Sequence, residues 1–179
     1  MVDPDGPGAP AGSVTVVVAD EQDEVDVDVR RWAALAEQVL VDEGRWGELT
    51  LTFVGRADIH ELNREHLGVD APTDVLSFPL DDDRGGVTAG VTTGDGAVPV
   101  LLGDVVVCPA VAASAAPEHA GTLDDELALL VVHGVLHVLG HDHTGDADTA
   151  AMQARERYHL ERSHWRGPAP PGFSLTHRD

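Results

Sequence analysis

The sequence contains no lysine, so arginine alone supplies its basic side chains: 11 of them against 32 acidic residues. The formal net charge of -21 favours solubility and repels polyanions at long range. This charge argues against a broad electrostatic surface for nucleic acid, and we expect no DNA partner. A local site where a metal and a few arginines hold phosphate stays compatible with it.

Cysteine and long apolar runs are also scarce. Cys108 is the only cysteine, which excludes an internal disulfide, and its apolar neighbours predict a small buried residue. The most apolar stretch, from Leu123 to Leu139, is interrupted by three acidic residues and two histidines and is too polar to span a membrane. The N-terminus lacks the features of a signal peptide. We therefore expect a cytoplasmic protein with no membrane partner.

The length of 179 residues and a hydrophobic content of 42% predict one domain with a sizeable core. We place this domain at residues 13–166. Proline and glycine predict a flexible segment at 1–12 and a flexible tail at 167–179, and the acidic, glycine-rich stretch 81–99 predicts a mobile loop.

Hydrophobic periodicity within the domain predicts four strands and five helices. Pro72 and Pro79 bracket the third strand, which favours a sheet edge or the ends of a strand for these prolines. Thr122 is the predicted cap of the fourth helix, with Asp125 resembling the partner in a capping box. The strands are expected at 14–18, 49–53, 72–79 and 100–107. The helices are expected at 28–40, 58–67 with Asp58 as cap, 110–116, 123–139, which is apolar nearly all round from residue 127, and 146–164.

The segment from His133 to His143, HGVLHVLGHDH, indicates a metal site. His133 and His137 are four residues apart, so a helix places them on one face, one turn apart. Gly140 is suited to end that helix with a positive φ, after which the chain can return His143 to the other two. Three imidazoles leave the fourth position of zinc open, as in catalytic sites. We therefore predict one Zn²⁺ per chain, with these three histidines as ligands and catalytic residues.

Zinc lowers the pKa of a bound water from about 15.7 to about 7, which suits hydrolysis of a carbonyl or a phosphodiester. The same histidine spacing occurs in metzincin peptidases, where glutamate follows the first histidine as general base. This sequence has Gly134 there, and Met152 lies in a predicted helix rather than in a convincing Met-turn. The pattern therefore favours phosphodiester cleavage over peptidase activity.

Two carboxylates are candidates for orienting a ligand histidine: Asp142, inside the motif, and Asp104, on the last strand. Either one can equally be a solvated residue. His141 ranks below His143 as a ligand, since adjacent residues rarely point at one metal. The remaining histidines are expected at the surface: 60, 66, 119, 159, 164 and 177.

Several segments in order resemble one known family. The motif from His133 to His143 closely resembles the signature of the YbeY family, zinc-dependent endoribonucleases of bacterial ribosomal RNA maturation. The segments Pro72–Pro79, PTDVLSFP, and Leu102–Cys108, LGDVVVC, match further signatures, and the pair Leu62-Asn63 precedes them at the usual distance. The ordered agreement runs from Leu62 to Glu156.

The resemblance implies a single α/β (α+β) domain with a small mixed sheet, helices packed against it, and zinc in a cleft on the central helix. It implies His133, His137 and His143 as the zinc ligands. It also implies single-stranded RNA as substrate, processing of the 3′ end of 16S ribosomal RNA, and a part in ribosome quality control. The partners would then be ribosomal RNA, the small ribosomal subunit and ribosome-assembly factors.

The sequence departs from the family pattern at two positions. The family usually has an aromatic residue at His141, and many members have an arginine, thought to hold or cleave RNA, where this chain has Leu67. Arg64, one helical turn earlier, is the candidate for that catalytic role here, and Arg56 is a further one. Leu67 and the negative charge also leave a non-enzymatic alternative: a ribosome-assembly binding factor whose zinc is structural.

Overall fold

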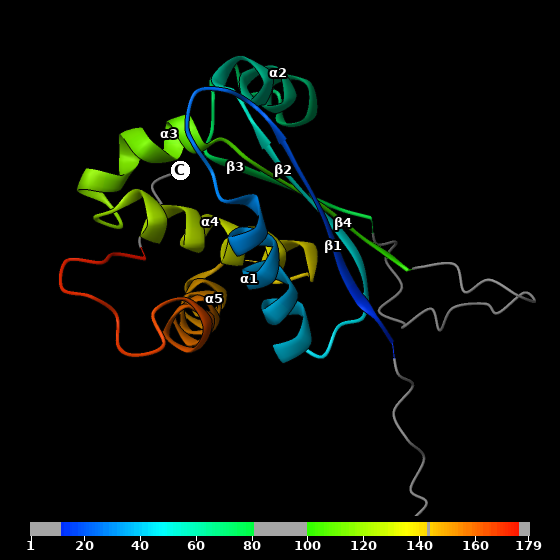
Figure 1. The fold of residues 1–179 in the computed structure, drawn as a ribbon, viewed down its shortest axis with the longest axis vertical. Helices are drawn as coiled ribbons and strands as arrows, with labels where there is room; N and C mark the ends of the chain where they lie inside the picture. The colour runs from blue at the N-terminus through cyan, green and yellow to red at the C-terminus, as the bar shows by residue number, and fades with distance from the viewer. Residues whose placement is uncertain (1–11, 81–99, 143, 176–179) are drawn as a thin grey trace, which may run out of the picture.

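The computed structural model describes residues 12–80, 100–142 and 144–175. The predicted N-terminal segment, apart from Gly12, and the predicted loop at 81–99 lie outside the described residues. Within them a twisted sheet is flanked by helices (Figure 1). The structure thus confirms the predicted α/β class.

The described part of the sheet has four strands in the order β1-β2-β4-β3. β1, β2 and β4 are parallel, and β3 runs antiparallel to β4 at the edge. The mixed sheet is confirmed, and so is the edge position that the two prolines predicted for β3. The strands are β1 (Val14–Glu21), β2 (Gly47–Val54), β3 (Val75–Pro79) and β4 (Leu101–Val107).

Five α-helices occur in the same residues, and four lie close to the predicted ranges. The exception is the start of α2, which begins at Arg56 after an extended Gly55. The prediction that Asp58 caps this helix is therefore wrong: Asp58 lies in the first turn, where its charge is favourable to the helix dipole. The helices are α1 (Val29–Asp42), α2 (Arg56–Leu67), α3 (Pro109–Ala115), followed by a 3-10 turn (Ala116–Glu118), α4 (Leu123–Val138) and α5 (Asp146–His159), which continues as a π-helix (Leu160–His164).

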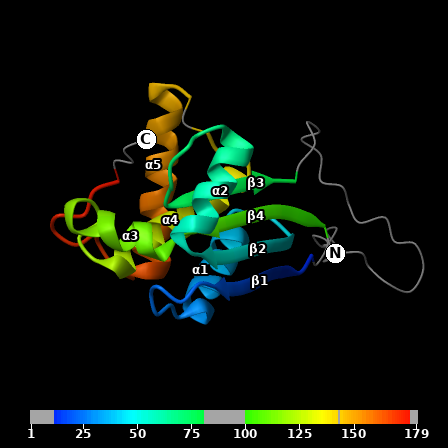
Figure 2. The same ribbon diagram turned by 90° about the horizontal axis from the view of Figure 1, so that it is seen from above.

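The two faces of the sheet carry different helices (Figure 2). Val105 and Val107 on β4 join α1 and α4 in the main core, while Val106 between them faces the smaller cluster with Ile59 of α2. This alternation follows from the two-residue period of a strand. The main core includes the stripe that periodicity predicted on α1: Trp32, Leu35, Ala36, Val39 and Leu40.

α4 is the buried helix of the domain, as its apolar composition predicted. Thr122 caps it, accepting a hydrogen bond from the Asp125 backbone N–H at 3.1 Å. The Asp125 carboxylate does not complete a capping box: it accepts hydrogen bonds from Trp165 Nε1 and His164 Nε2, each at 2.7 Å. Burial opposes ionisation there, but these bonds lower the pKa of Asp125 below its usual value. The N-terminus of α4 is thereby tied to the segment after α5.

Part of the predicted C-terminal tail is described, up to residue 175. Phe173 packs edge-on against Trp165, with ring centroids 4.6 Å apart. Both side chains lie against the main core. The assignment of 167–179 as flexible, like the domain boundaries at 13 and 166, stays a prediction.

Cys108 lies at the end of β4 and is fully buried, as predicted. Its burial raises the pKa of the thiol, which keeps it in the unreactive form. Among the described residues, no helix combines the length and the apolar character that crossing a membrane requires.

Candidate metal centre and its surroundings

His133 and His137 lie together on α4, as their spacing predicted. Their ring centroids are 4.5 Å apart with an interplanar angle of 77°. His133 is buried and His137 half-buried. The helix ends at Val138, and Gly140 has a φ of 95°, the turn expected of it. His143 lies outside the described residues, so its place as third ligand stays a prediction.

A carboxylate on α5 contacts the first of these histidines. Glu156 Oε1 lies 2.5 Å from His133 Nδ1, and the two side chains are only 3% and 11% exposed. Because a carboxylate only accepts hydrogen bonds, Nδ1 donates and Nε2 keeps the lone pair that binds a metal. Sequence reasoning did not single out Glu156. The available signal was a glutamate on the buried side of a helix, between Met152 and Leu160.

The donor chemistry of the described pair fits a zinc ion. It consists of two neighbouring imidazoles on a buried helix, one of them oriented by a carboxylate. Within the described ranges, no three His, Cys, Asp or Glu side chains gather in the arrangement of a complete metal shell. The pair therefore needs a further ligand, for which the sequence offers His143.

α4 lies very close to the sheet at Gly134. A Cβ added at this residue would be 2.5 Å from Val105 Cγ1 and 3.4 Å from Ser77 Oγ. The Ser77 hydroxyl donates to the Gly134 carbonyl at 3.1 Å and holds β3 against the helix. A glutamate can occupy this position only if the Val105 side chain, or the helix itself, shifts. The peptidase interpretation therefore loses its general base for a steric reason as well as a chemical one.

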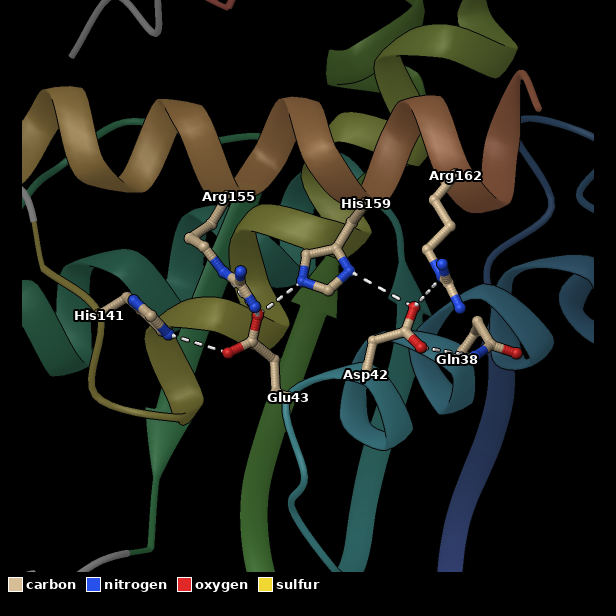
Figure 3. A network of polar contacts seen from close by, with 7 residues as sticks. All are labelled: Gln38, Asp42, Glu43, His141, Arg155, His159 and Arg162. Carbon is tan, nitrogen blue, oxygen red and sulfur yellow. Dashed lines mark hydrogen bonds and ion pairs between the residues drawn. The ribbon is translucent and has the colours of Figure 1, made fainter. Parts of the chain in front are cut away.

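A second histidine–carboxylate contact joins α5 to the end of α1 (Figure 3). Glu43 accepts hydrogen bonds from Arg155 and, at 2.6 Å, from His159 Nε2. Its other oxygen lies 3.5 Å from His141 Nε2. Burial alone would raise the pKa of Glu43, but the bonds from His159 and Arg155 lower it. This carboxylate therefore links α1, α5 and the turn that leads to His143.

His159 corrects an expectation from the sequence, which placed it at the surface. Its side chain is fully buried, and burial lowers its pKa, with Glu43 partly opposing that effect. Nδ1 of the same ring lies 4.0 Å from Asp42 Oδ2 and has no hydrogen bond within the described structure. Asp42 in turn accepts from Arg162 Nε at 3.1 Å and from Gln38 Nε2 at 3.0 Å.

The two carboxylates proposed from sequence to orient a ligand histidine occupy different surroundings. Asp142 is exposed just after the helix, and Asp104 is half-buried on β4, opposite Phe78 of β3. No described hydrogen bond connects either one to His133 or His137. Their orienting roles stay predictions, and the carboxylate observed on His133 is Glu156.

The arginines proposed for RNA lie on α2, across the sheet from α4. Arg64 is 3.8 Å from Glu61 in an exposed pair, and no described contact joins it to the histidines. Arg56 donates to the Ala110 carbonyl at 2.8 Å and thereby links α2 to α3. Leu67 is 63% exposed at the end of the helix. Arg56 therefore has a structural partner, whereas Arg64 keeps most of its surface in solvent.

Comparisons with known proteins identify the family to which this chain belongs. The family model described as Endoribonuclease YbeY matches residues 17–164. The chain belongs to the YbeY endoribonuclease family. The matched range covers the whole ordered set of motifs, from the Leu62-Asn63 pair to Glu156, and so includes both ends of the His133–Glu156 contact.

Individual relatives agree with this assignment. The chain is 41% identical over 152 residues to Endoribonuclease YbeY of Pelotomaculum thermopropionicum, a match that covers 82% of this chain and 95% of the relative. It is 40% identical over 147 residues to Endoribonuclease YbeY of Salinispora tropica, covering 79% and 93%. The solution structure of TM1509 from Thermotoga maritima superposes with a TM-score of 0.57 at 26% identity, covering 84% of this chain and 91% of that one.

Proposed function

We propose that this chain is a zinc-dependent endoribonuclease that cleaves single-stranded RNA. The observation that carries the proposal is the pairing of His133 and His137 on α4, with His133 oriented by the buried Glu156. Orientation of a ligand histidine by a carboxylate is a recurrent feature of zinc sites. Membership in the YbeY family supports RNA as the substrate class.

Each residue of the site would have a separate task. His133 and His137, with His143 as third ligand, would hold the metal, which supplies a Lewis acid and an activated water when bound. Glu156 would fix the tautomer of His133, so that Nε2 carries the lone pair directed at the metal. Arg64 would contact phosphate from α2.

The cellular substrate we propose is the 3′ end of 16S ribosomal RNA, with a part in ribosome quality control. The partners would be the small ribosomal subunit and its assembly factors, in the cytoplasm where ribosomes are made. The support is the resemblance of the motifs and the names of the curated relatives.

The direct test is cleavage of a single-stranded RNA by the purified protein. We expect cleavage that a chelator abolishes and added zinc restores. His137→Ala should lose both cleavage and bound zinc, since two imidazoles hold zinc far less tightly than three. His60→Ala is the matched control, because His60 is an exposed histidine that pairs with Asp70 on the far side of the sheet. Stoichiometric zinc in a folded protein that cleaves no RNA would contradict the nuclease proposal.

One observation favours a second function, that of a binding factor in ribosome assembly. Leu67 places an exposed apolar side chain at the end of α2, at the position where many family members have an arginine. If binding is the function, His137→Ala should still co-sediment with small subunits and still support their maturation. Loss of maturation with binding retained would favour the enzyme.

A further inference from the structure

A groove between α1 and the segment after α5 forms a cavity of about 710 Å³. Its lining includes Arg31 and Gln38 from α1 and Arg162, His164 and Arg166 from the other side. None of the described lining residues is a carboxylate, and the nearest carboxylate to Arg31 is the exposed Asp124, whose Oδ2 lies 2.7 Å from Arg31 Nη1. In a chain of net charge -21, this is a local reversal of the general surface charge.

The basic surface continues from this groove along α5. Tyr158 is 42% exposed, and the guanidinium carbons of Arg155 and Arg162 lie 5.0 and 6.0 Å from its ring centroid. Positions 155, 158 and 162 share one face of the helix. We call the series Arg155, Tyr158, Arg162 and Arg166 the arginine–tyrosine strip.

The two carboxylates that pair with arginines of the strip lie beneath it. Asp42 and Glu43 pair with Arg162 and Arg155, and their side chains are only 8% and 10% exposed. Each guanidinium has five N–H donors, so both keep donors that no described hydrogen bond uses. Arg166 is exposed, has a φ of 55° and has no described ion pair. The strip therefore presents cations and donors outward.

One end of the strip lies next to the candidate metal centre. Arg155 precedes Glu156, the residue in contact with His133, and shares the Glu43 carboxylate with His141. Figure 3 shows the order along α5, from the turn with His141, past Arg155 and His159, to Arg162 and Gln38. Gln38 and Arg162 also line the groove. The basic surface thus runs from the metal centre to the cavity.

We propose that the arginine–tyrosine strip and the groove bind a single RNA strand whose scissile segment lies at the histidines. The guanidiniums of Arg155, Arg162 and Arg166 contact successive phosphates, and the Tyr158 ring stacks on a base. Arg31 contacts the strand from the opposite wall of the groove. This inference rests on the proposed function for the class of its ligand.

The chemistry of the strip matches that of surfaces for single strands. Such surfaces combine a basic track along the backbone with aromatic rings on which bases stack, and they need no sequence-specific contacts. A duplex would present phosphates in two strands and would hide the faces of its bases from Tyr158. The net negative charge of the chain repels RNA at a distance. The strip provides a local positive charge that attracts it.

The test is the affinity of the full-length protein for a labelled 12-nucleotide single-stranded RNA, measured by fluorescence anisotropy with a chelator present so that no cleavage occurs. Arg162→Gln/Arg166→Gln should weaken binding about tenfold and reduce the slope of log affinity against log salt by about 1.4. Tyr158→Ala should weaken binding roughly tenfold with little change in that slope. A 5-iodouridine in the same RNA should form a photo-crosslink at Tyr158.

The matched control is Arg30→Gln/Arg157→Gln, which removes the same charge from exposed positions outside the strip and the groove. An equal loss of affinity in this control would overturn the proposal, since it would show a general charge effect. Unchanged affinity in both strip variants, which circular dichroism shows to be folded, would also overturn it. So would a mononucleotide such as AMP that competes as well as the 12-mer, because the groove would then be a nucleotide pocket.

The outcomes for binding and for cleavage are distinct. RNA that binds at the strip and is not cleaved after zinc is restored would refute the proposed nuclease and support the strip. Cleavage of the same RNA with an affinity that does not depend on the strip would support the nuclease and overturn the strip.

Discussion

Two buried histidines contact glutamates in almost the same way, yet their surroundings differ. His133 Nδ1 lies 2.5 Å from Glu156, and His159 Nε2 lies 2.6 Å from Glu43. The ring of His133 faces a second imidazole at 4.5 Å, on the half-buried side of α4. The second nitrogen of His159 is enclosed and faces Asp42 at 4.0 Å.

The difference teaches what separates a ligand histidine from a structural one. In both pairs a carboxylate fixes the tautomer, so the hydrogen bond alone does not identify a metal site. The environment of the other nitrogen decides the role: a neighbouring imidazole at His133, a closed polar network at His159. The first pair should therefore govern metal affinity, and the second should govern the stability of the fold.

The largest expected effect is on stability, at the structural pair. Glu43→Ala leaves the buried His159 without its acceptor and Arg155 without its ion pair. The free energy of unfolding should fall by about 3–5 kcal/mol, measured by urea denaturation of the metal-free protein. Glu37→Ala, an exposed position on the same helix, should change it little. Equal effects in the two variants would remove the distinction between the pairs.

The second largest effect is expected on the affinity for zinc at His133 and His137. Glu156→Gln keeps the shape of the side chain but weakens its hold on the His133 tautomer. Zinc affinity, measured by competition with a chromophoric chelator, should fall 10- to 100-fold, or about 1.4–2.7 kcal/mol. Glu161→Gln, in the exposed pair with Arg157, serves as control. Unchanged affinity for zinc in Glu156→Gln would show that this carboxylate has no role at the metal.

The third prediction is that the ionisation of His159 makes the free energy of unfolding depend on pH. Its pKa is lowered from the ordinary 6.5 by burial, so the unfolded chain takes up the proton more readily than the folded one. This contribution to stability is complete above pH 6.5 and is lost as the pH falls below it, with a slope of at most about 1.4 kcal/mol per pH unit. His159→Gln should flatten the curve between pH 7 and 5. Glu43 and Asp125, whose pKa values are also lowered, act only at lower pH.

The smallest effect is expected at a third histidine–carboxylate pair, on the surface. His60 Nε2 lies 2.8 Å from Asp70, but the side chains are 41% and 79% exposed. Asp70→Asn should change the free energy of unfolding by less than about 1 kcal/mol, and the difference should shrink in high salt. A change as large as that of Glu43→Ala would show that burial does not determine how much a histidine–carboxylate pair contributes to stability.

Much of the fold could be predicted because its signals are local. The apolar stripe of α1, the prolines around β3 and the glycine after α4 each act within a few residues, and each prediction is confirmed. The predicted start of α2 is wrong. The extended Gly55 is its N-cap, so the helix begins at Arg56, two residues before the expected cap Asp58. In the site, the spacing of His133 and His137 predicted their contact for the same local reason.

The rest of the site depends on how distant helices pack. Glu156 reaches His133 from 23 residues away, and His159 reaches Glu43 from 116 away. The helical spacing of His159 from Met152 and Glu156 was the only sequence signal of its burial, and its acceptor Glu43 comes from the end of α1, far away in the chain. The sequence shows only that Gly134 replaces a catalytic glutamate. That a side chain at this position would also collide with Val105 depends on β4, which lies beside α4 only in the folded chain.

The place of Glu156 in the chain order has a consequence for biosynthesis. The ribosome delivers His133 and His137 before it delivers α5, so a nascent chain carries the histidine pair for some time without its orienting carboxylate. At about 5–20 residues per second, the 23 residues between His133 and Glu156 take on the order of seconds. A chain released early, before α5 docks, would hold metal poorly. Tight metal binding would therefore wait until α5 has docked and Glu156 contacts His133.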